Sequence, residues 1–110
     1  MNDMFSYRNK RTYEDFKEEI PNMIQPLFES IREFCISLGE NVVEDVRMHR
    51  IVFGKSITFR WFADIEPQND GIIIKIQKNR KEPPQIVNVK LDQEITELKK
   101  ILRKSYETIH

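Results

Sequence analysis

Residues 57–66 read ITFRWFADIE, and this stretch sets the fold class. Its odd-numbered residues are apolar and most of its even-numbered residues are polar, which is the two-residue repeat of a strand with one buried face. Trp61 is odd-numbered, so we expect it to anchor the core, while Arg60 and Phe62 point outward. A strand with one buried face needs a second layer to cover that face.

Further strands are expected on both sides of this segment. Residues 46–53 are rich in β-branched side chains, and Gly54 with the following lysine predicts a tight reversal. The run PQNDG at 67–71 predicts a second turn, and the isoleucines of 72–76 predict a third strand. Alternation over residues 87–91 predicts a short fourth strand at an edge. The pattern therefore predicts an antiparallel meander of three to four strands.

Apolar residues recur at helical spacing in three other segments, 12–20, 24–38 and 92–109. Gly39 is expected to end the second helix with a left-handed backbone, and Asp92 is expected to cap the third. The sequence thus predicts an α+β fold of two layers, in which helices pack on one face of a three- to four-stranded antiparallel sheet.

The domain organisation is simple. Residues 1–11 form a basic N-terminal tail, whose order the sequence leaves open, and residues 12–110 are long enough for a single α+β domain. No apolar stretch has the length of a signal peptide core or a membrane span, so we expect a cytoplasmic protein with no membrane partner. Cys35 is the only cysteine, which excludes an intramolecular disulfide.

Charge is divided along the chain although the formal net charge is zero. Residues 12–45 carry a balance of −7, whereas residues 46–90 carry nine lysines and arginines against four carboxylates, a balance of +5. The predicted helical half is therefore acidic, and the predicted sheet is basic.

No arrangement of residues predicts catalysis or a metal site. His49 lies between a methionine and an arginine, where a solvated histidine is expected, and Cys35 falls on an apolar helical stripe, where it should be an inert core residue. Asp64 and Glu66, with Lys75 on the next strand, resemble the paired acids and lysine of a metal-dependent nuclease, but a third acidic ligand is not evident. We assign no catalytic residue, metal or cofactor.

The basic segment supplies the candidate binding residues. If the even-numbered side chains of 57–66 face solvent, they share one sheet face with side chains of the next strand and of the loop after it. Cations neutralise phosphates, and an exposed aromatic ring stacks on a base. The alternative is that this is the ordinary polar face of an antiparallel sheet. The predicted nucleic-acid or partner-binding residues are Arg60, Phe62, Lys75, Lys78, Arg80 and Lys81.

Several stretches also resemble one family. They are LFESIREF at 27–34, LGENV at 38–42, ADIEPQ at 63–68, the strand over 71–76 and the closing helix, so the resemblance spans most of residues 24–107. The family consists of uncharacterised domains found beside restriction-type endonuclease domains, and its members are often labelled predicted transport proteins. The resemblance implies an α+β accessory domain, often joined to a nuclease, with no catalytic residues to carry over.

Three functional hypotheses follow. The first is a non-enzymatic binding module that contacts nucleic acid or a nuclease through the basic sheet face. The second is a protein-interaction module or homodimer that uses the sheet face or the edge strand near Val87. The third is a small hydrolase that uses Asp64 and Glu66.

Overall fold

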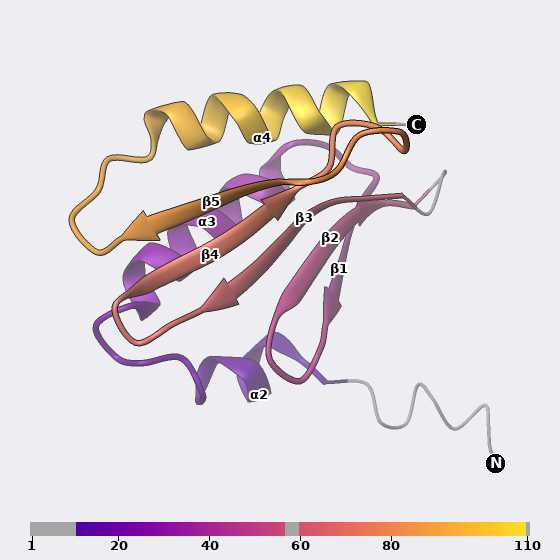
Figure 1. Ribbon diagram of the computed structural model, residues 1–110. Coiled ribbons are helices and arrows are strands. Elements are labelled where there is room, and N and C mark those ends of the chain that lie inside the picture. The colour runs from indigo at the N-terminus through magenta and orange to yellow at the C-terminus, as the bar shows by residue number, and fades with distance from the viewer. Residues whose placement is uncertain (1–10, 57–59, 110) are drawn as a thin grey trace, which may run out of the picture.

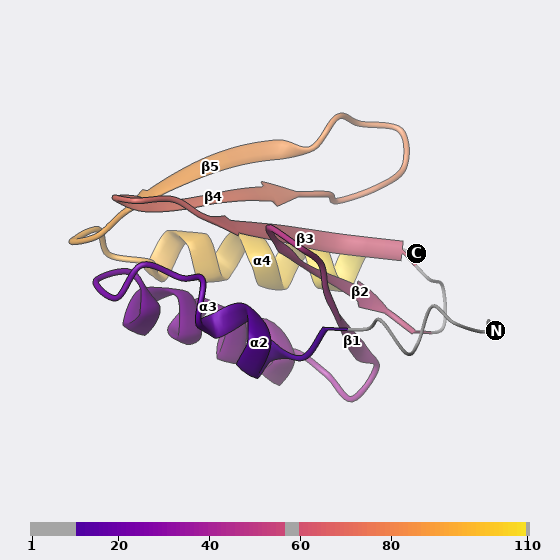
Figure 2. The same cartoon turned by 90° about the horizontal axis from the view of Figure 1, so that it is seen from below.

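The computed structural model describes residues 11–56 and 60–109. Its five-stranded antiparallel sheet has the order β1-β2-β3-β4-β5, and three helices cover one face of it (Figures 1 and 2). The predicted two-layer α+β architecture is therefore confirmed. The predictions for residues 1–10, Ile57 and Phe59 lie outside the described residues. The elements are α2 (Tyr13–Lys17), α3 (Gln25–Ser37), β1 (Val42–Val46), β2 (Ile51–Lys55), β3 (Arg60–Pro67), β4 (Gly71–Ile76), β5 (Gln85–Lys90) and α4 (Thr96–Thr108).

The fifth strand arises because the first reversal comes earlier than predicted. The chain turns between β1 and β2, where the Arg47 N–H donates to the Arg50 carbonyl oxygen at 2.9 Å. Gly54 is not in a turn but inside β2, where it pairs with Trp61. The turn predicted at residues 67–71 is confirmed, with the Gln68 N–H donating to the Gly71 carbonyl oxygen at 2.8 Å.

A β-bulge in β3 overturns the predicted orientation of two aromatic residues. Phe53 pairs with Ala63 and Gly54 pairs with Trp61, so Phe62 is an extra residue between two consecutive pairs. The bulge shifts the alternation by one position. Phe62 and Ala63 both point into the helical layer and are fully buried, whereas Trp61 lies half-buried on the opposite face.

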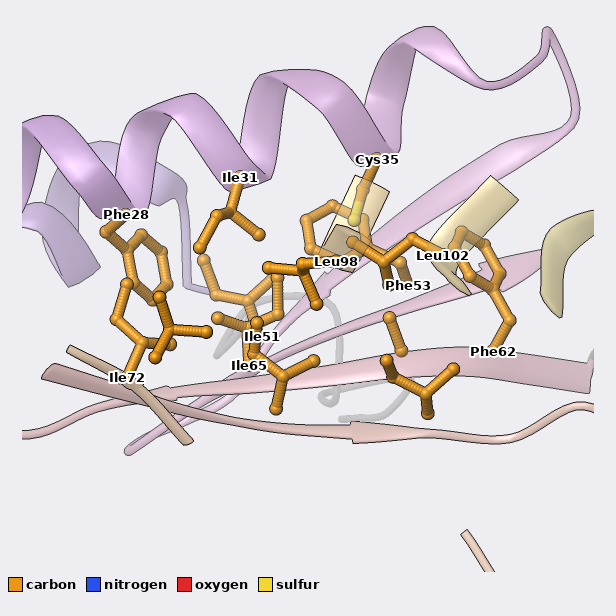
Figure 3. Close-up of a cluster of buried hydrophobic side chains, with 14 of the residues drawn as sticks. Phe28, Ile31, Cys35, Ile51, Phe53, Phe62, Ile65, Ile72, Leu98 and Leu102 are labelled. Carbon is orange, nitrogen blue, oxygen red and sulfur yellow. The ribbon is translucent and has the colours of Figure 1, made fainter. Parts of the chain in front are cut away.

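The hydrophobic core fills the space between the sheet and the helices (Figure 3). Phe28, Ile31 and Cys35 project from α3 toward the sheet, while Leu98 and Leu102 project from α4. Burying side chains of this size contributes roughly 1.5–3 kcal/mol each. The helices cover one face of the sheet only, and we call the other face the open face.

The helix ends match the sequence in part. Thr12 and Asp15 form the reciprocal capping box that begins α2. Asp92 does not cap α4, which begins after Ile95 without a side-chain cap. Gly39 has no left-handed backbone; it makes room for Tyr106, whose hydroxyl would lie 2.1 Å from a Cβ at this position.

Candidate functional site

The predicted basic sheet face does not form as one surface. Phe62 is fully buried and packs edge-on against Tyr106, with ring centroids 5.4 Å apart, so its predicted role as an exposed stacking residue is wrong. Arg60 begins β3 and lines a hollow beside Trp61. Lys75 lies in the middle of β4 on the open face, because its neighbours Ile74 and Ile76 both point into the core. The binding roles of Arg60 and Lys75 stay predictions.

Charges of both signs mix on the open face. Asp64 pairs in register with Lys75 on β4, and its carboxylate lies 3.3 Å from Nε of Arg50. Burial raises the pKa of Asp64, while Arg50 and Lys75 act in the opposite direction. Because these cations lie beside a carboxylate, this part of the face is a poor phosphate-binding surface.

The open face also carries apolar side chains at the β1–β2–β3 end. Val43, Val52 and Trp61 line a hollow of about 250 Å³, with Asp45 and Arg47 at its border. Val43 is 45% exposed, whereas Val52 is 7% exposed although it lies outside the core cluster. We call this feature the Trp61 hollow.

The three remaining predicted residues lie together in the connection between β4 and β5. Lys78, Arg80 and Lys81 occupy a loop that internal hydrogen bonds hold in place. The Gln77 side-chain amide donates to the Glu82 carbonyl oxygen at 2.7 Å, and the Asn79 side-chain oxygen accepts from the Lys81 N–H at 2.9 Å. The loop thus presents Arg80 and Lys81 to solvent from a defined backbone.

A second group of cations lies on α4. Its four members occupy two adjacent helical rows, because Lys99 and Arg103 are four residues apart, as are Lys100 and Lys104. Lys99 and Arg103 each lie 5.5 Å from the ring centroid of Phe34 on α3. With Thr96 and Glu107, these five residues line a hollow of about 510 Å³ between the two helices.

Thr108 joins the two groups of cations. Its hydroxyl oxygen lies 3.2 Å from the Lys78 carbonyl oxygen in the loop and 3.0 Å from the Lys104 carbonyl oxygen in the preceding helical turn. The loop and the last turn of α4 therefore lie side by side and form one surface near the C-terminus. Figure 1 shows the two elements next to each other there. We call this surface the α4–loop surface. Its cations are Lys78, Arg80 and Lys81 in the loop and Lys99, Lys100, Arg103 and Lys104 on α4. Lys104 lies on the same side of α4 as Thr108, whereas Lys99 and Arg103 lie beside Phe34 on the α3 side of the helix.

None of these seven cations belongs to an ion pair within the part of the chain that the structure describes. The acidic side chains that lie among them are Glu82 in the loop and Glu97 and Glu107 on α4. The surface is therefore strongly positive, and its charge is not neutralised locally.

The sequence prediction missed the four cations on α4. Counting charges by segment hid them, because residues 91–110 contain four cations and four carboxylates. The two lysine and arginine pairs at i, i+4 spacing were the available signal, since such pairs share one side of a helix. The β4–β5 loop lies beside the end of α4 only in the folded chain, where Thr108 contacts Lys78.

The residues considered for catalysis do not form a reactive site. Cys35 is fully buried, and burial raises the pKa of its thiol to about 12, as expected for an inert core residue. His49 is exposed in the turn between β1 and β2. Asp64 and Glu66 share the open face, but no group of three or more metal-ligating side chains occurs among the residues at 11–56 and 60–109.

No family model, curated protein or solved structure matches this chain. The resemblance to nuclease-associated domains therefore stays a prediction. Among the described residues, no helix has the length and apolar character that crossing a membrane requires.

Proposed function

We propose that this protein is a non-enzymatic module that binds the phosphate backbone of nucleic acid through the α4–loop surface. The observation that carries the proposal is that two neighbouring elements carry seven cations, none of them in an ion pair with a described residue. Phosphate contacts of this kind release condensed counterions and supply most of non-specific affinity.

The dimensions of the surface fit an extended ligand. The ten residues from Lys99 to Thr108 span nine steps of 1.5 Å, about 14 Å along α4, and the loop extends the surface further. The phosphates of one strand of duplex DNA recur about every 3.4 Å along the helix axis, so about four of them fit along this length. A long polyanion therefore matches the surface better than a small anion does.

The binding test is fluorescence anisotropy with labelled single-stranded and duplex DNA and RNA at about 50 and about 200 mM salt. Binding in the micromolar range at the lower salt is expected, with a steep loss at the higher salt, because several phosphate contacts are involved. Absence of binding to all four probes at the lower salt contradicts the proposal.

Two matched triple variants locate the site. R80Q/K100Q/K104Q removes three positive charges from the α4–loop surface, whereas R47Q/K75Q/K90Q removes three from the open face and its edge. The first should lower affinity at least about 10-fold at low salt, and the second should stay within about threefold of the wild type. The opposite pattern assigns the site to the sheet face. Far-ultraviolet circular dichroism checks that both variants are folded.

A further inference from the structure

The two edges of the sheet differ in how they are protected from pairing with another chain. β1 carries Glu44 and Asp45, and two copies of β1 placed side by side would bring these carboxylates together. β5 reads QIVNVK and carries no charge before Lys90, its last residue. An uncharged edge strand offers its outward backbone N–H and C=O groups to another strand. Figure 2 shows that no described element lies beyond this edge.

Apolar side chains line the β5 edge on both faces of the sheet. Ile86 is 58% exposed on the open face, and Val87 is half-buried on the helical face. Ile101 of α4, also half-buried, lies two helical turns before Thr108 and so on the same side of the helix. That side faces the β4–β5 hairpin, because the Thr108 hydroxyl contacts Lys78. We call the surface formed by Ile86, Val87 and Ile101 the apolar edge.

We infer that a second copy of this chain pairs antiparallel with β5 and covers the apolar edge. A twofold axis perpendicular to the sheet makes two identical edge strands antiparallel, and it keeps the helical layers of both copies on the same side. Both α4–loop surfaces then lie on that side as well. The pairing does not depend on nucleic-acid binding.

Only registers that align like faces are compatible with this geometry, because a slip by one residue moves every side chain to the other face. Two such registers pair five of the six residues of β5 with the other copy, and the others pair fewer. In the first, Val87 lies opposite Val87 of the other copy, and Ile86 lies opposite Asn88. In the second, Asn88 lies opposite Asn88, Val87 opposite Val89, and Ile86 opposite Lys90. Both cover Ile86 and Val87 without placing like charges opposite each other.

The test is sedimentation velocity of the nucleic-acid-free protein from about 5 to about 500 µM, since an interface based on one strand pair predicts a dissociation constant in the micromolar range. The wild type should change from monomer to dimer across this range. I86K/N88K should stay monomeric, because either register then places lysines directly opposite each other. Both positions are exposed, so the midpoint of urea unfolding should stay close to that of the wild type.

A charge-swapped variant distinguishes the registers. I86K/N88E places lysine opposite glutamate in the first register and should restore or strengthen the dimer. In the second register it places glutamate opposite glutamate, and the protein should stay monomeric. Either result, together with a wild-type dimer and a monomeric I86K/N88K, supports pairing through β5.

The matched control is V43K/D45N on β1, which adds the same charge of +2 on the open face of the other edge. It should dimerise like the wild type. Three results overturn the inference: a wild type that stays monomeric at every concentration, a dimer that I86K/N88K leaves intact, and a dimer that V43K/D45N abolishes.

Discussion

The cations on the two sides of the helical layer differ in whether they form ion pairs. Where α2, α3 and β1 meet, Arg11 binds Glu19 at 2.6 Å, and Lys17 and Arg32 also lie in ion pairs. On the α4–loop surface, no cation has a carboxylate partner within the described residues. The same residue types therefore hold elements together on one side and are available to a ligand on the other.

We call the side where α2, α3 and β1 meet the paired side. Its ion pairs and hydrogen bonds form one connected network. The Tyr13 hydroxyl donates to Oε2 of Glu29 at 3.0 Å, and Nζ of Lys17 lies 3.1 Å from the same oxygen. The Arg32 guanidinium lies 3.8 Å from the Tyr13 ring centroid, and its Nη2 donates to Glu44 at 3.0 Å. The hydrogen bond from Lys17 is the largest factor that lowers the pKa of Glu29, and burial is the largest that raises the pKa of Tyr13. These contacts connect α2, α3 and β1.

The largest expected effect comes from breaking this network at Arg32. R32M leaves the Glu44 carboxylate, whose side chain is 20% exposed, without its partner beneath α3. The free energy of unfolding, measured by urea denaturation at pH 7, should fall by about 2 kcal/mol. R103M is the matched control on the α4–loop surface, and its loss should stay below about 1 kcal/mol. Equal losses of unfolding free energy in R32M and R103M would contradict the view that only the ion pairs of the paired side stabilise the fold.

The salt dependence of nucleic-acid binding compares the two sides directly. K100Q/K104Q should reduce the slope of log affinity against log salt concentration by about 2 for duplex DNA, because two phosphate contacts are lost. R11Q/K17Q removes the same charge from the paired side and should leave the slope unchanged. Anisotropy titrations at several salt concentrations measure both slopes. A similar change in both variants would show that only the total charge matters.

The pH dependence of stability should sharpen the comparison further. The folded state holds the pKa of Glu29 below its usual value, so this carboxylate stabilises the fold above that usual value, and the contribution disappears as the pH falls through the lowered pKa. E29Q should therefore lose less stability than the wild type between about pH 5 and about pH 3. E107Q, on the α4–loop surface, should follow the wild type. Urea midpoints across this range measure the difference.

The smallest effect concerns Asp64, which lies outside both regions. Burial raises its pKa even though Arg50 is 3.3 Å away, so the folded state disfavours the charged carboxylate relative to the unfolded chain. This carboxylate reduces stability above its folded pKa. D64N should raise the free energy of unfolding at pH 7 slightly, by less than about 1 kcal/mol. A loss larger than that in urea denaturation would mean that the pair with Arg50 outweighs the burial.

Much of the fold followed from local patterns. The helical spacing over 12–20 predicted a helix where α2 lies, and the turn at 67–71 was placed correctly. The sequence left open whether the basic residues form one surface. In the structure, the loop cations Lys78, Arg80 and Lys81 lie beside residues of α4 and not beside β3. The prediction that Phe62 points outward was wrong, because a bulge changes which face a residue occupies without leaving a signal in the alternation of apolar and polar residues.

By itself, the sequence determined the element types, the two layers and the general position of the loop, since these depend on periodicity and on residues with strong local preferences. Only the tertiary structure decided which charges are paired. It brings Arg32 beside Glu44 across 12 residues, and it brings Thr108 of α4 beside Lys78 across 30 residues. Ion pairs and surfaces depend on distances of a few ångströms between elements, and only the packing of the helices on the sheet fixes those distances.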